Sequence, residues 1–173
     1  MRKRQKDRDL TRVAYHEAGH AVANFFFGRS VKSITIKATE KSGGKTILHR
    51  AKPADIRTTR RPRYYVEREI ICYFAGSAAE EHYFPDMDCA EKFTSFNDFK
   101  MACGLAEQFC PRPPEAEAYW KWLYERTVTF ISSEPYWSAV SSIANALMTH
   151  KTVSGRAARQ IYNECCSRQR PES

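Results

Sequence analysis

The sequence lacks the patterns that mark several common protein classes. None of its six cysteines forms a C-x-x-C pair, and the adjacent Cys165 and Cys166 make a poor disulfide framework, so we expect a reducing, cytoplasmic compartment. No apolar run approaches the length of a membrane span and no apolar signal core follows the basic N-terminus, so we expect a soluble protein. The sequence also contains no P-loop pattern, no repeat and no low-complexity tract.

The composition is typical of one globular domain. The chain has 173 residues, of which 42% are hydrophobic and 13% aromatic. We expect a flexible basic lead-in over residues 1–10 and a single domain over 11–173. The formal net charge is +8. This excess permits a nucleic-acid or acidic partner without requiring one, and we expect no nucleic-acid partner.

Hydrophobic spacing predicts a mainly helical chain with a small β-sheet near its N-terminal half, an α+β fold. Thr11, Ser95 and Ser154 are predicted N-caps, and Gly28 is a predicted helix stop. Gly76, inside a predicted helix, indicates close packing against another backbone. The predicted helices cover 11–27, 64–83, 96–109, 115–132, 134–150 and 154–166, and the predicted strands cover 31–37 and 45–50.

The first predicted helix carries His16-Glu17-Ala18-Gly19-His20. Residues four apart share a helix face, so His16 and His20 can direct two imidazoles at one metal ion. Glu17 can lie beside the open coordination position and take a proton from water there. This H-E-x-x-H arrangement is typical of zinc metallopeptidases.

Such a site requires a third protein ligand from elsewhere in the chain. His49 lies on a predicted strand, His82 follows a pair of glutamates, and His150 ends a late helix. Asp98 lies in the first turn of the helix predicted over 96–109. Spacing alone leaves these alternatives open.

Several segments together resemble the peptidase domain of FtsH-type AAA+ zinc proteases. They follow the order of that family and extend over most of the chain, which is more specific than the H-E-x-x-H motif alone. These segments are Val13–Val22, Val31–Ile36, Gly44–Leu48, Ala75–Glu81, Ser95–Ala106 and Ala146–Ser154.

The resemblance implies a zincin-like helix and a bound Zn²⁺ ion. It implies that His16, His20 and Asp98 are the zinc ligands and that Glu17 is the general base. It also places Glu80 near the site, either as an alternative ligand or as the hydrogen-bond partner of a histidine.

The sequence departs from this family in ways that affect the expected function. The sequence contains no P-loop pattern and no apolar run of membrane length, so we expect neither the ATPase module nor the membrane anchor of that family. The family's Gly-Gly-Arg reads Ala75-Gly76-Ser77. The segment Cys110–Arg126 does not resemble the family closely. We therefore expect a stand-alone, ATP-independent zinc metalloendopeptidase that hydrolyses unfolded or flexible polypeptides, as a monomer or a homo-oligomer. The alternative is a peptidase-like protein with little turnover that acts as a binding or regulatory module.

The second predicted strand is the expected substrate-binding element. Thr46, Ile47 and Leu48 on it would pair with an extended peptide through backbone hydrogen bonds. The alternative is an ordinary sheet edge without a ligand.

Overall fold

The computed structural model describes residues 2–37, 44–48, 62–86, 96–110 and 112–167. Helices predominate, and three short strands form one antiparallel sheet, which confirms the mainly helical α+β class. The elements in chain order are α1 (Arg2–Phe26), β1 (Val31–Thr35), β2 (Lys45–Leu48), α2 (Pro62–Tyr83), α3 (Phe96–Phe109), α4 (Pro113–Ser132), α5 (Tyr136–His150), β3 (Thr152–Ser154) and α6 (Gly155–Ser167). Across these ranges, no helix combines the length and the apolar character that a bilayer crossing requires.

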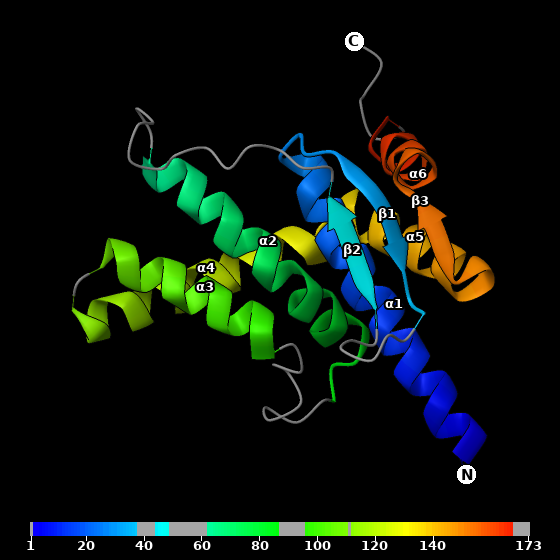
Figure 1. The fold of residues 1–173 in the computed structure, drawn as a ribbon, viewed down its shortest axis with the longest axis horizontal. Helices are drawn as coiled ribbons and strands as arrows, with labels where there is room; N and C mark the ends of the chain where they lie inside the picture. The colour runs from blue at the N-terminus through cyan, green and yellow to red at the C-terminus, as the bar shows by residue number, and fades with distance from the viewer. Residues whose placement is uncertain (1, 38–43, 49–61, 87–95, 111, 168–173) are drawn as a thin grey trace.

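Helices α1 and α2 form the centre of the molecule (Figure 1). Helix α1 packs against α2 and α5, and α2 also packs against α3 and α4. Gly19 allows the two central helices to approach closely, because a Cβ atom there would lie 2.2 Å from the carbonyl oxygen of Ala75. The H-E-x-x-H segment therefore lies where α1 and α2 approach each other closely.

The sequence predicted the C-terminal end of α1 correctly but not its N-terminal end. The predicted start at Thr11 is wrong, because α1 begins at Arg2. Residues 2–10 contain neither glycine nor proline, so nothing in them interrupts the helix. The predicted stop is confirmed: Gly28 has φ +72°, its N–H donates to Phe25 (3.0 Å), and the Arg29 N–H donates to Asn24 (2.8 Å). This pair of hydrogen bonds is a Schellman motif.

The sheet has the strand order β2-β1-β3, and both pairings are antiparallel. The two predicted strands are confirmed as β1 and β2, although β1 ends at Thr35 rather than at residue 37. The register shifts between Val31 and Ser33, and this irregularity lets Val31 and Ile34 both be buried although they are three positions apart. Strand β3 was not predicted, because only three residues form it directly after α5. Lys151, in the left-handed region at φ 62°, turns the chain between them.

The remaining helices follow the prediction closely. Helix α3 matches the range expected for it. Helices α2 and α4 each begin two residues early, at Pro62 and Pro113, because proline is favourable in the first helical positions. The Ser154 hydroxyl accepts the N–H of Ala157 (3.2 Å), as predicted for the cap of α6. Ser95, the predicted cap of α3, lies outside the described residues.

Candidate metal centre

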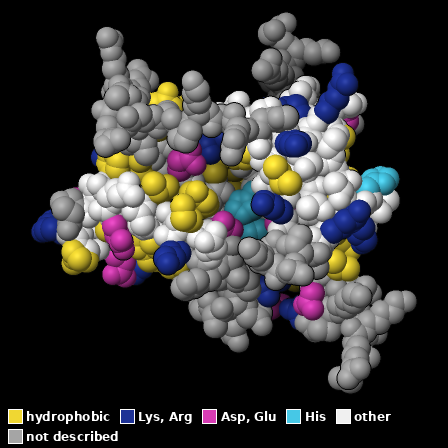
Figure 2. All heavy atoms as spheres, viewed as in Figure 1, with side chains coloured by type: hydrophobic (Ala, Val, Ile, Leu, Met, Phe, Trp, Pro, Cys, Tyr) yellow, Lys and Arg dark blue, Asp and Glu magenta, His cyan; other side chains and the backbone are white. Residues whose placement is uncertain are grey.

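Two helices bring a His-His-Asp group together. His16 and His20 lie one turn apart on α1, with their Nε2 atoms 2.9 Å from each other. Asp98, in the first turn of α3, places Oδ2 at 3.4 Å from His16 Nε2 and 3.3 Å from His20 Nε2. One ligand atom from each residue lies within 4.8 Å of the others. Figure 2 shows histidine side chains in a hollow near the centre of this face, beside an acidic side chain.

The opposite nitrogen of each imidazole contacts a hydrogen-bond acceptor. His16 Nδ1 lies 2.5 Å from a Glu80 carboxylate oxygen, and His20 Nδ1 lies 2.8 Å from the carbonyl oxygen of Cys72. Both Nδ1 atoms therefore carry protons, and in neutral rings both Nε2 lone pairs point into the space between the histidines. At 2.9 Å two lone pairs repel each other, unless one Nε2 carries a proton and donates it to the other or both face a cation. This donor set fits a divalent metal ion.

The charges around His16 favour positive charge at the same place. Burial lowers the pKa of His16, but the hydrogen bonds to Asp98 and Glu80 and the nearby carboxylates outweigh it and raise the pKa to about 10. The side chains of His16, His20 and Asp98 are only 12%, 13% and 21% exposed, so solvent screens these interactions weakly. A proton or a metal ion satisfies this demand for positive charge.

Glu80 lies behind His16 rather than among the Nε2 atoms. Its side chain is 2% exposed, and its second oxygen accepts from Arg12 Nε at 2.5 Å. Burial alone raises the pKa of Glu80, but the hydrogen bonds and charges of His16 and Arg12 hold it below the usual value. Of the two roles predicted for Glu80, the geometry favours the hydrogen-bond partner that orients His16.

Gly76 on α2 makes room for the two imidazoles. A Cβ atom at this position would lie 2.6 Å from His16 Cε1 and 2.7 Å from His20 Nε2. The predicted close approach to another backbone is therefore wrong at Gly76, which faces side chains, and it applies instead to Gly19 on α1. A glycine in a helix interior is unfavourable by itself, so its presence here reflects the space that the site needs.

Replacing Gly76 by Ala is expected to destabilise the protein by about 1–3 kcal/mol, because the imidazoles must move to admit the methyl group. It is also expected to weaken metal binding. The matched control is Gly104→Ala in α3, where a Cβ meets nothing within 4 Å and a gain of about 0.5–1 kcal/mol is expected. Thermal unfolding and metal titration of both variants check this; equal behaviour of the two would contradict it.

Glu17 points from α1 to the start of β2. One carboxylate oxygen, Oε2, accepts the Thr46 hydroxyl hydrogen bond at 2.7 Å, and Glu17 is only 6% exposed. A Cβ atom on Gly44 would lie 2.9 Å from the other oxygen, Oε1. The residue predicted as the base is therefore held by the strand predicted to bind substrate.

Strand β2 is an edge of the sheet in the described part of the chain. Ile47 and Leu48 on it are 36% and 39% exposed. Large apolar side chains beside an open strand edge suit contact with another extended chain.

Of the other predicted third ligands, the two that the structure describes do not join the group. His82 packs edge-on against Trp137 at 4.2 Å between ring centroids, and His150 ends α5. His49 lies outside the described residues. Burial raises the pKa of the Cys72 thiol to about 12, so this cysteine contributes its carbonyl and keeps its proton.

Sequence reasoning missed two contributors, Arg12 and Cys72. Arg12 lies one helical turn before His16, so it extends the spacing that joins His16 to His20. Cys72 lies one turn before Gly76 on α2. The spacing of Arg12 from His16 could have indicated its role. The role of Cys72 could not be predicted, because every residue has a backbone carbonyl.

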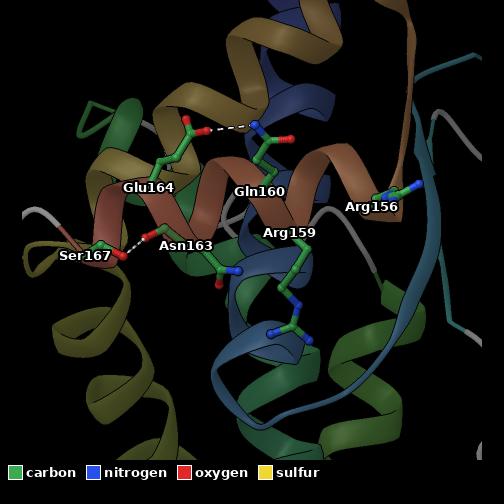
Figure 3. A pocket seen from close by; sticks show the side chains of 6 residues that line it. All are labelled: Arg156, Arg159, Gln160, Asn163, Glu164 and Ser167. Atoms are coloured by element: carbon green, nitrogen blue, oxygen red, sulfur yellow. Dashed lines mark hydrogen bonds between the residues drawn. The ribbon is translucent and has the colours of Figure 1, made fainter.

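A second hollow lies along α6 and shares no residue with the metal group (Figure 3). The Arg159 guanidinium donates to the carbonyls of Phe25 and Arg29 at the end of α1, where positive charge stabilises a helix. Gln160 donates to Glu164 at 2.9 Å. The side chains that line it are Arg156, Arg159, Gln160, Asn163, Glu164 and Ser167.

Comparison with known proteins indicates a distant relationship. The chain is 32% identical over 107 residues to the ATP-dependent zinc metalloprotease FtsH of Aster yellows witches'-broom phytoplasma (strain AYWB). The aligned segment covers 61% of this chain but 15% of that protein, so the chain spans a small part of its relative's length. The chain matches no known protein-family model. The similarity supports a distant FtsH relationship and hints at a protease-related function.

Proposed function

We propose that this protein is an ATP-independent zinc metallopeptidase that hydrolyses peptide bonds in unfolded or flexible polypeptides. The observation that carries the proposal is the convergence of His16, His20 and Asp98. The buried Glu17 adds to it, because its charge acts on His16. The FtsH similarity supports the same reaction class. Metal-assisted hydrolysis requires a metal site and an acid or base near it.

In this proposal His16 and His20 would hold Zn²⁺ through Nε2, and Asp98 would hold it through a carboxylate oxygen. Three protein ligands leave a coordination position open, as catalytic zinc sites require. A bound zinc ion supplies Lewis-acid polarisation of a carbonyl group and a lower pKa of water. The Glu80 contact keeps the proton of His16 on Nδ1 and so keeps Nε2 available as a donor.

Glu17 acts as the general base and then as the general acid. Its carboxylate accepts a proton from the attacking water and passes that proton to the leaving amine. Glu17 follows His16 directly on α1, and its charge helps to raise the pKa of His16, which supports this role. Proton transfer by one positioned group contributes typically about 100- to 10,000-fold in rate.

The substrate in this proposal lies along β2. An extended peptide can pair with the open strand edge through main-chain hydrogen bonds, while Ile47 and Leu48 offer apolar contact. A folded substrate uses its backbone groups in its own helices and sheets. Main-chain pairing with β2 therefore selects unfolded segments. Main-chain pairing provides little sequence selectivity.

The test is cleavage of casein and of a compact folded protein by the purified chain, without nucleotide. We expect metal-dependent cleavage of casein, its loss with 1,10-phenanthroline and its recovery with added Zn²⁺. The bound metal is measured by elemental analysis, because the same ligands accept other divalent ions. Stoichiometric metal without cleavage of varied unfolded substrates would reject the peptidase and support the binding or regulatory alternative.

A further inference from the structure

The hydroxyl of Thr46 makes a contact that the proposed ligand and base roles leave unused. It donates to Glu17 Oε2 at 2.7 Å and lies 3.1 Å from the Glu17 carbonyl oxygen. The two residues are on different elements, β2 and α1. A short hydrogen bond to a carboxylate that is 6% exposed restricts the orientation of that carboxylate strongly.

Gly44 allows β2 to run this close to α1. A Cβ atom there would lie 2.6 Å from Val13 Cγ1 and 2.9 Å from Glu17 Oε1. The carboxylate of Glu17 is thus bounded by the Gly44 backbone on one oxygen and by the Thr46 hydroxyl on the other. Glu17 itself provides the proton transfer, and the strand decides where its oxygens point.

We infer that Thr46 is a positioning residue that orients the Glu17 carboxylate and couples this orientation to strand β2. The inference rests on the proposed peptidase function. Since β2 is an open edge in the described part of the sheet, a peptide that pairs with it also orders the strand that carries Thr46. Binding of an extended substrate and alignment of the base are then one event.

A positioning role predicts a specific kinetic signature. Thr46→Val keeps the β-branched shape and the strand propensity and removes only the hydroxyl. We expect kcat to fall about 10- to 100-fold, as for loss of a hydrogen bond to a charged group, with KM changed by less than about threefold. Thr46→Ser retains a hydroxyl and is expected to recover most of kcat.

Thr35→Val in β1 is the matched control. The Thr35 hydroxyl bonds to Thr152 Oγ1 at 2.8 Å and to the Lys151 carbonyl at 3.2 Å, so it serves sheet pairing away from Glu17. We expect wild-type kcat for this variant. Zinc content and melting temperature are measured for all variants. These values separate a changed orientation of Glu17 from a loss of metal or of folding.

The ¹³C carboxyl shift of Glu17, assigned with Glu17→Gln, reports the contact independently of turnover. We expect Thr46→Val to move this shift and Thr35→Val to leave it. A kcat for Thr46→Val equal to that of Thr35→Val would overturn the inference while the peptidase proposal stands. If the wild type cleaves nothing, the peptidase proposal fails, and an unmoved Glu17 shift in Thr46→Val overturns the inference separately.

Discussion

Replacing Glu17 by Gln is expected to reduce peptide cleavage by about 100- to 10,000-fold and to leave zinc content unchanged. Glutamine has nearly the same shape but cannot accept a proton from water. Its amide oxygen still accepts the Thr46 hydroxyl, so the buried contact at 2.7 Å is preserved. Glu17 is outside the His-His-Asp group, so its replacement removes no ligand. The measurement is kcat/KM on unfolded substrates together with metal content.

Glu81→Gln is a suitable control for Glu17→Gln. Glu81 accepts the Tyr124 hydroxyl at 2.6 Å, and glutamine can still accept it, so the same chemical change is made outside the metal group. We expect cleavage close to the wild-type rate. Activity of Glu17→Gln within about threefold of this control would be far above the loss expected for a general base and would reject that role.

Replacing Asp98 by Ala is expected to abolish tight zinc binding. Its Oδ2 atom lies 3.3 and 3.4 Å from the two Nε2 atoms, and a methyl group supplies neither a ligand nor a charge. Zinc at about 100 times its dissociation constant stabilises a folded protein by about 2.7 kcal/mol. The wild type should therefore gain melting temperature on zinc addition and Asp98→Ala should not. Competition with a chromogenic chelator measures the affinity.

Glu80→Gln distinguishes a ligand from a residue that orients one. Its side-chain oxygen still accepts His16 Nδ1, while the charge that faces Arg12 is lost. We expect zinc affinity to fall about 10- to 100-fold, which is less than in Asp98→Ala. Wild-type affinity in Asp98→Ala combined with lost affinity in Glu80→Gln would move the third ligand to Glu80.

The parts of the site that sequence reasoning predicted best depend on local geometry. His16 and His20 share a face because residues four apart on any α-helix do. Gly28 ends α1 because glycine adopts positive φ without strain, and Ser154 caps α6 because its hydroxyl reaches the backbone three residues on. None of these inferences needs knowledge of neighbouring elements.

The parts it missed depend on contacts between distant segments. Gly76 was predicted to face a backbone but faces two imidazoles, and strand β3 exists only because β1 is there to pair with it. The register shift after Val31 decides which β1 side chains are buried. The local sequence of a short strand or around a helix glycine does not identify the residues that it contacts.

The sequence by itself determined that two imidazoles and one carboxylate share a stretch of α1, because helix periodicity sets their relative positions. The family resemblance named Asp98 and Glu80 as distant partners, but only the tertiary structure brings them to the imidazoles. Asp98 is 78 positions after His20 and Glu80 is 64 after His16, so their distances depend on how α2 and α3 pack on α1. That packing depends on small residues at the helix contacts, as at Gly19. The spacing of residues along the chain does not predict how the helices are placed relative to one another.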